Sequence, residues 1–265
     1  DEIIAGPLRA IVQALQAEGM IDRWFFIRYS DPEPHLRLRF HARQEKDIQP
    51  LLALILQWSR QQVEVGLLRR YMLDTYEREV ERYGGPATID LFEQIFTVNS
   101  AITSNIISAR VTNRLSLDEV AIAVFTLDHY FAALGWDFQQ RLLWIQSNSE
   151  KYTSSKEFRP LRKLYCDLLA PWENQIEAET ATQREYLLEL VKPQEEPLGR
   201  LVAQVRKLAE QEALWLPEEA ILGSLAHMHI NRLLGIDMTR EQQIYAFWRH
   251  TLDSLHLRPE RPTGL

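Results

Sequence analysis

One short segment near the start of the chain constrains the fold more than any other. Trp24–Tyr29 is an aromatic and β-branched run, Ser30–Pro34 is rich in turn-forming residues, and His35–Phe40 alternates strictly between basic and apolar side chains. Because successive side chains of a strand point to opposite faces, this period of two is typical of a half-buried β-strand. Two such runs joined by a turn predict a β-hairpin with a longer loop.

The sequence around this hairpin predicts a small sheet covered by helices. Apolar residues recur at helical spacing in residues 2–18 and again from about Gln44 to Gln62, and Val65–Leu73 is a further β-like run. Two strands, a helix and another strand make a small antiparallel sheet packed against helices. We therefore expect an α+β fold whose N-terminal part contains this sheet.

From residue 86 onward the pattern is helical, which predicts a mostly α-helical bundle after the sheet. The expected helices include 88–113, 117–134 and 138–148. We expect a single domain over 1–265, divided into an α+β sheet part (1–85), a helical part (86–258) and a disordered tail (259–265). The polar stretch from Glu173 to Pro197 is expected to be an exposed or mobile connection.

Composition and charge exclude several classes of partner. The chain has 265 residues, of which 46% are apolar, and a net charge of −7, so its overall field repels phosphate backbones and anionic membranes. No run reaches the roughly 18 apolar residues that span a bilayer. The single cysteine, Cys166, excludes an internal disulfide and a cysteine-based zinc cluster. We expect a cytoplasmic protein that binds neither nucleic acid nor a membrane.

The second strand of the expected hairpin has one apolar and one basic face. The apolar set is Leu36, Leu38 and Phe40, and the basic set is His35, Arg37 and Arg39. Arg28 on the preceding strand adds a third guanidinium if the hairpin register turns it to the basic face. Like charges this close are tolerated when the surface is open to water or when an anion lies between them. A solvated strand face and an anion site therefore both stay open at this point.

A second charged segment follows the expected third strand. Residues 74–86 are dense in charge and end in Tyr83-Gly84-Gly85-Pro86, which predicts a turn. Segments that leave the end of a strand are favoured places for site residues, so Tyr76 and Arg82 are candidates for the same pocket as the strand arginines. The alternative is ion pairing within the segment, among Glu77, Arg78, Glu79, Glu81 and Arg82.

Residues 225–235 carry two histidines on an expected helix. At about 100° per residue, His227 and His229 point roughly 200° apart, so they do not chelate one metal as an i, i+4 pair does. His227 shares a stripe of small and polar residues with Asn231, whereas His229 lies within an apolar arc. His227 is therefore the acid-base candidate and His229 the packing histidine, with a satisfied core histidine as the alternative for either. No metal site is expected.

Three of these segments together resemble a known family. Phe26–Phe40, Asp74–Gly85 and His227–Gly235 look like segments of the C-terminal elimination domain of class I lanthipeptide dehydratases, also called the thiopeptide-type bacteriocin biosynthesis domain. The resemblance implies a lyase that acts on a ribosomally synthesised precursor peptide. Such an enzyme eliminates glutamate from glutamylated Ser or Thr residues and leaves dehydroalanine or dehydrobutyrine.

The resemblance also implies roles for the matched residues. Elimination next to an amide develops enolate charge, which fixed cations stabilise, and a guanidinium fork binds the carboxylate of the leaving glutamate. We expect Arg37, Arg39 and Arg82 to share these two tasks and His227 to move the proton. The residues expected to contact the substrate are Arg28, His35, Tyr76, Asn231 and His229. No cofactor is expected, because ester elimination involves neither hydride transfer nor a metal.

The expected partners follow from the same resemblance. Family dehydratases carry a large preceding region that transfers glutamate, so we expect a separate glutamylating enzyme in addition to the precursor's leader and glutamylated core. Whether the chain forms a homodimer is left open. Two other functions also stay open. One is a thiopeptide pyridine synthase, which joins two dehydroalanines in a formal cycloaddition and releases the leader, and the other is a catalytically silent module that binds a leader peptide.

Overall fold

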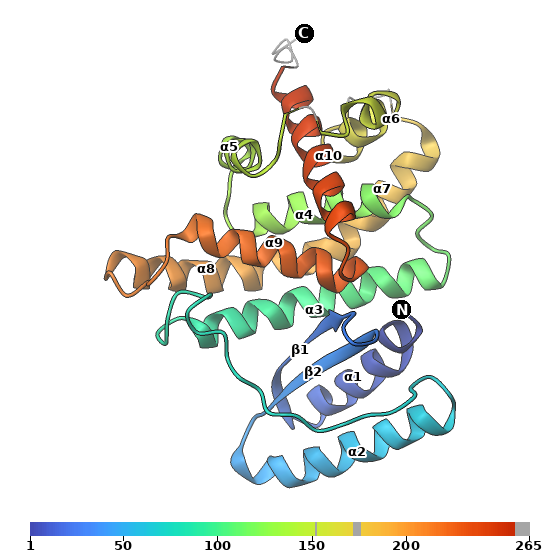
Figure 1. Ribbon diagram of the computed structural model, residues 1–265, viewed down its shortest axis with the longest axis vertical. Helices are drawn as coiled ribbons and strands as arrows, with labels where there is room; N and C mark the ends of the chain where they lie inside the picture. The colour runs from blue at the N-terminus through green and yellow to red at the C-terminus, as the bar shows by residue number, and fades with distance from the viewer. Residues whose placement is uncertain (152, 172–175, 258–265) are drawn as a thin grey trace. The chain divides into compact units, whose positions relative to one another are not determined.

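A computed structural model describes residues 1–151, 153–171 and 176–257 (Figure 1). Its contacts divide the chain into two units, one of Asp1–Leu115 with Glu196–Ile236 and the other of Ser116–Glu195 with the chain from Asp237 onward. The predicted α+β fold, with a small antiparallel sheet packed against helices, is confirmed. The tail predicted over 259–265 lies outside the described residues.

The first unit holds the sheet. β1 (Ile21–Tyr29) and β2 (His35–Ala42) form the predicted antiparallel hairpin, in which Ile27 lies opposite Arg37 and Phe25 lies opposite Arg39. The helices of this unit are η1 (Ile4–Leu8), α1 (Arg9–Ala17), η2 (Glu45–Asp47), α2 (Ile48–Glu64), α3 (Ile89–Val111), α8 (Glu195–Glu210) and α9 (Glu218–Leu234). The long helix α3 packs along β1 (Figure 1).

Side chains of α3 satisfy the outer edge of β1. The backbone N–H of Trp24 donates to the Thr97 hydroxyl at 3.1 Å, and that of Phe26 donates to the Ser100 hydroxyl at 3.4 Å. A buried donor without a partner costs about 1–3 kcal/mol, so these two hydroxyls within an apolar helix have a structural reason. They fix α3 against the strand.

Helix α9 continues the same edge. The amide of Asn231 accepts from the N–H of Arg28 at 3.0 Å and donates to its carbonyl at 2.9 Å, as a further strand would. The Nε of Arg232 donates to the Phe26 carbonyl at 3.0 Å. These bonds place the face of α9 that carries Asn231 against β1.

The prediction of a third strand over Val65–Leu73 is wrong. Residues 65–79 form turns and irregular structure, and the sheet has two strands within the described residues. The apolar side chains of this run are largely exposed, with Met72 at 77% and Leu73 at 63%. Because β-propensity reflects packing on a half-buried sheet surface, a run that gains no burial has little reason to pair.

The predicted turn at Tyr83-Gly84-Gly85-Pro86 leads into α3. Gly84 and Gly85 have φ values of +81° and +104°, a region that favours glycine. Trp215, from the loop between α8 and α9, packs on this turn. Its backbone N–H donates to the Gly84 carbonyl at 3.1 Å. A Cβ at Gly85 would lie 3.0 Å from the indole ring. The two glycines therefore permit a close approach of this loop.

The second unit consists of helices within its described residues. They are α4 (Glu119–Ala133), α5 (Phe138–Asn148), α6 (Ser155–Leu169), α7 (Ala178–Val191), η3 (Lys192–Gln194) and α10 (Met238–His256). Phe131, Trp144 and Trp248 form an aromatic cluster, with ring centres 4.9 Å and 5.0 Å from Phe131. The predicted helices 117–134 and 138–148 are confirmed as α4 and α5.

The predicted exposed connection from Glu173 to Pro197 is wrong for most of its length. Residues 178–191 form α7, and both Leu187 and Val191 are buried. Residues 173–175 lie outside the described part of the chain. A helix that is polar on most of its surface but anchored by a few apolar residues has the composition of a linker, which explains the error.

Candidate functional site

The candidate site lies on the basic face of the hairpin, within the first unit. His35, Arg37 and Arg39 share one face of β2, as predicted. Arg28 lies opposite Leu36 and therefore on the other face. Neither Arg37 nor Arg39 forms an ion pair in the part of the chain that the structure describes, whereas Arg23, Arg28 and Arg78 do.

A tyrosine ring supports Arg37. Its guanidinium carbon lies 3.9 Å from the centre of the Tyr29 ring, and the same ring stacks on His35 with 5.3 Å between centres. The Nε of Arg37 donates to Nε2 of His35 at 3.4 Å, while Nδ1 of His35 lies 2.8 Å from the Glu33 carbonyl. A neutral imidazole with its proton on Nδ1 satisfies both contacts.

A second tyrosine supports Arg39. The Arg39 guanidinium carbon lies 5.0 Å from the centre of the Tyr76 ring, and Nη1 donates to the Leu38 carbonyl at 3.1 Å. Its Nε is buried and has no hydrogen-bond partner among the described residues. Because buried donors are nearly always paired in folded proteins, this N–H points to a missing acceptor.

Arg39 lines a small pocket of about 240 Å³, whose walls include Phe25, Phe40, His41 and Tyr76. Pockets for drug-sized ligands measure about 300–1,000 Å³. This pocket is therefore suited to a group of the size of one amino-acid side chain. Its arginine and aromatic walls favour an anion with some apolar surface.

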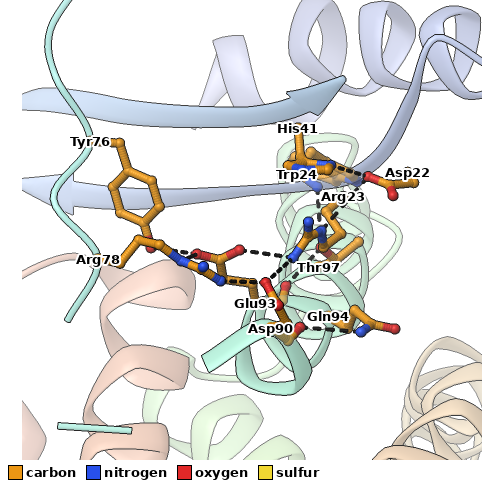
Figure 2. A network of polar contacts seen from close by, with 10 residues as sticks. All are labelled: Asp22, Arg23, Trp24, His41, Tyr76, Arg78, Asp90, Glu93, Gln94 and Thr97. Atoms are coloured by element: carbon orange, nitrogen blue, oxygen red, sulfur yellow. Dashed lines mark hydrogen bonds and ion pairs between the residues drawn. The ribbon is translucent and has the colours of Figure 1, made fainter. Parts of the chain in front are cut away.

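An ion-pair network forms one wall of the pocket (Figure 2). Glu93 on α3 accepts from Arg23 at 3.0 Å, from Arg78 Nε at 2.7 Å and from the Tyr76 hydroxyl at 3.1 Å. Asp90, one turn earlier, accepts from the same two arginines. The bond from Arg78, followed by that from Arg23, lowers the pKa of Asp90. Asp90 is thus held as an anion, and each of the two arginines pairs with both carboxylates.

Tyr76 is the predicted site residue that the structure brings to Arg39. Its ring also contacts Phe25 edge-on, with 5.8 Å between centres. Burial, followed by the charge of Glu93, raises the pKa of Tyr76 above its usual value. The phenol therefore stays protonated and acts as a donor to Glu93.

Two other predicted arginines have partners of their own. Arg28 pairs with Asp1 at 2.7 Å and donates to the carbonyls of Arg232 and Leu233 at the end of α9. Arg82 pairs with Glu79 at 2.9 Å on the surface. The pairing within residues 74–86 that we kept as an alternative thus applies to Arg82, whereas Arg78 pairs with α3.

The two histidines of α9 have different environments. His229 is fully buried, and its Nδ1 lies 2.8 Å from Nδ2 of Asn99. Burial, followed by the charge of Arg232, lowers the pKa of His229 to about 3, so the ring is neutral. His227 is half-buried and lies one turn before Asn231, on the side of the helix that meets β1. Asn231 itself is engaged with the backbone of Arg28, as described above.

Sequence reasoning missed two residues of this arrangement, Tyr29 and Glu93. Tyr29 lies opposite His35, so the predicted hairpin would have pointed to it once the register was known. Glu93 shares an otherwise apolar helical stripe with Ile89, Phe92 and Phe96. An acid at such a position is itself a signal, because buried carboxylates need partners.

The described residues contain no group of three or more His, Cys, Asp or Glu side chains that could hold a metal ion. None of the helices in the same part of the chain has the length and apolar character needed to cross a membrane.

Comparison with known proteins assigns the family. Residues 1–252 match the family model described as lantibiotic biosynthesis dehydratase C-term. The chain belongs to this family. The resemblance predicted from the three sequence segments is thereby confirmed.

Individual relatives are distant in sequence, but their matches cover most of the chain. Subtilin biosynthesis protein SpaB of Bacillus subtilis is 27% identical over 235 residues, which are 87% of this chain and 22% of SpaB. Nisin biosynthesis protein NisB of Lactococcus lactis subsp. lactis is 25% identical over 238 residues, which are 89% of this chain and 22% of NisB. The chain therefore spans less than a quarter of the length of these relatives.

A solved structure shares the fold. The crystal structure of the tRNA-dependent lantibiotic dehydratase MibB from Microbispora sp. 107891 matches with a TM-score of 0.76 and 24% identity. The match covers 96% of this chain and 27% of the MibB chain.

Proposed function

We propose that this chain eliminates glutamate from glutamylated Ser or Thr residues of a ribosomally synthesised precursor peptide and leaves dehydroalanine or dehydrobutyrine. The family match supports a part in precursor dehydration, and a separate glutamylating enzyme would supply the ester substrate. The single observation that carries the proposal is the pair Arg37 and Arg39. Both lie against tyrosine rings on one strand face, and neither has a carboxylate partner among the described residues.

The proposed reaction develops negative charge at two places. A base removes the α-proton of the glutamylated residue, the electron pair forms the Cα=Cβ bond, and the Cβ–O ester bond breaks. Charge develops on the neighbouring amide oxygen and then on the carboxylate of the leaving glutamate. Fixed cations in a partly desolvated site favour both, because they need no reorganisation as the charge appears.

We assign the leaving glutamate to Arg39 and the amide oxygen to Arg37. The unpaired Nε of Arg39 and the small pocket that it lines suit a carboxylate held by a guanidinium fork. Arg37 lies two residues away on the same face, at a spacing of roughly 7 Å along the strand. An anionic transition state between them relieves the repulsion of the two cations.

His227 is the proposed proton carrier. Its half-buried position on the side of α9 that meets β1 supports this role, whereas the buried and neutral His229 is occupied by Asn99. Arg82 is a further proposed contact of the substrate carboxylates. Its exposed pair with Glu79 is worth only about 0–1 kcal/mol, so it opposes such a rearrangement weakly.

The proposal is tested with a peptide that carries a chemically prepared glutamyl ester on one serine. Incubation with the chain should release free glutamate and convert that serine to dehydroalanine, both followed by mass spectrometry. An ester that stays intact while the peptide binds would instead support the silent peptide-binding module. Activity only on an already dehydrated peptide, with loss of the leader, would support the pyridine synthase.

A further inference from the structure

We propose that Glu93 is a positioning residue of the elimination site, which acts by holding Tyr76 against the Arg39 guanidinium. This inference rests on the function proposed above. Glu93 lies on α3 and does not contact Arg39 itself. Its effect on the reaction would pass through the phenol of Tyr76 (Figure 2).

The carboxylate of Glu93 joins three separate parts of the first unit. Its side chain is only 7% exposed. One oxygen accepts from the Tyr76 hydroxyl and from Arg78, while the other accepts from Arg23 on β1. The segment after α2, the strand and the helix therefore meet at a single buried anion. Such charge-assisted bonds are shorter and stronger than neutral ones.

Tyr76 depends on this anchor because its own segment offers little order. Residues 65–79 have no regular secondary structure, and most of their side chains are exposed. Apart from the contacts with Glu93 and Arg39, the ring of Tyr76 is held by the edge of Phe25. Without the bond to Glu93, the hydroxyl loses its acceptor and the ring loses a fixed position.

Arg39 in turn depends on Tyr76. Among the described residues its guanidinium forms one hydrogen bond, to the carbonyl of Leu38, and the tyrosine ring is its second support. A side chain with four rotatable bonds leaves a productive geometry easily when one support is removed. Small displacements of a charge-stabilising group lower the rate of the chemical step more than they weaken substrate binding.

Three substitutions test the inference in the elimination assay. Glu93→Gln removes the anion with little change of shape, and Tyr76→Phe removes only the hydroxyl. The matched control is Asp90→Asn, because Asp90 accepts from the same two arginines but does not contact Tyr76. We expect Glu93→Gln and Tyr76→Phe each to lower kcat by about 10- to 100-fold with little change in KM. Asp90→Asn, which changes the same wall of the pocket, should lower kcat by less than either of these two variants.

The double variant Glu93→Gln/Tyr76→Phe separates a linked pair from two independent effects. If Glu93 acts through the phenol, the double variant should be no slower than the slower single variant. Three results would each overturn the inference. They are a loss of kcat in the double variant equal to the product of the two single losses, a change in KM with kcat unchanged, and a Glu93→Gln protein as fast as Asp90→Asn. Tyr76→Phe keeps the test valid if Glu93→Gln fails to fold.

Hydrogen exchange gives a readout that does not need the reaction. Amides around Tyr76 should exchange faster in Glu93→Gln than in the wild type, and by more than in Asp90→Asn, which loses a bond from Arg78 but keeps the bond between Tyr76 and Glu93. If the wild-type chain releases no glutamate, the proposed function fails. The exchange experiment still shows whether Glu93 holds Tyr76 in place. Equal exchange in Glu93→Gln and the wild type overturns the inference.

Discussion

The Arg37 guanidinium carbon lies 3.9 Å from the centre of the Tyr29 ring, on the strand opposite. Tyr29 also stacks on His35, which accepts from Arg37, so this ring supports both basic side chains at the loop end of the hairpin. A guanidinium is attracted to the face of an aromatic ring and keeps its full charge there. The Tyr29 ring thus holds a cation in place and leaves it available for an anionic ligand.

Replacement of Arg37 by lysine should lower the proposed elimination activity although the charge is kept. An ammonium group is not planar, so it neither stacks on Tyr29 in the same way nor offers parallel N–H donors. We expect kcat/KM for the glutamylated peptide to fall by about tenfold or more, a loss of about 1.4 kcal/mol of transition-state stabilisation. A lysine variant as active as the wild type would show that charge alone is sufficient.

His227→Gln should abolish turnover and leave the fold intact. Loss of a general acid-base group typically costs about 10²- to 10⁴-fold in rate. Because the side chain is half-buried, the melting temperature should change by no more than a few degrees, roughly 2–4 °C. The matched control is His256→Gln, at the exposed end of α10. Equal activity of the two variants would remove His227 from the mechanism.

The stability of the protein should depend on pH through His229. The pKa of this buried group is about 3 in the folded protein and near 6.5 in the unfolded chain. Between these values the unfolded state binds the additional proton, so the free energy of unfolding falls as the pH falls. The contribution of the neutral ring is fully present above pH 6.5 and is lost as the pH approaches 3.

His229→Gln tests this dependence. Glutamine cannot be protonated in this range, and its carbonyl can replace Nδ1 as the acceptor for Asn99. Urea denaturation at several pH values between about 5 and 7 should give a shallower slope for the variant than for the wild type. Identical slopes would mean that His229 does not titrate on unfolding.

Gly85→Ala should destabilise the first unit. The new Cβ would lie 3.0 Å from the Trp215 ring, and the φ of +104° is strained for any residue with a side chain. We expect a loss of about 1–3 kcal/mol in the free energy of unfolding. Gly199→Ala is the control, because it lies within α8 and its Cβ meets nothing within 4 Å. That variant should be stabilised by about 0.5–1 kcal/mol, and the reverse order of the two variants would contradict the structure.

The hairpin and the long helices were predictable because each pattern reports a burial that the fold provides. His35–Phe40 alternates and has two different faces, and the central helices repeat every three or four residues. The third strand was not predictable from the same rule. Val65–Leu73 has the composition of a strand, but the edge of β1 is taken by side chains of α3 and α9, and its own side chains stay exposed. The composition of a segment does not show which edge of a sheet is free to pair with it.

The candidate site was predictable in part, for a similar reason. The basic face followed from the period of two, and Tyr76 was a candidate because it was expected to follow a third strand, which residues 65–73 do not form. Long-range pairing was not visible: Arg28 turns to α9, and Arg78 and Arg23 meet at Glu93. Arg28 lies 204 positions from its partner Arg232, and Arg23 lies 70 positions from Glu93. Only the three-dimensional structure brings residues this far apart in the sequence together.

The rate of glutamate release by Arg39→Met tests the central claim most directly. Methionine keeps much of the apolar length and removes the guanidinium of Arg39, whose Nε is buried without a hydrogen-bond partner among the described residues. The account predicts that single-turnover release from a glutamylated peptide falls by about 100-fold or more, while Arg43→Met, beyond the end of β2, stays near the wild-type rate. Release by Arg39→Met at the rate of Arg43→Met would contradict it.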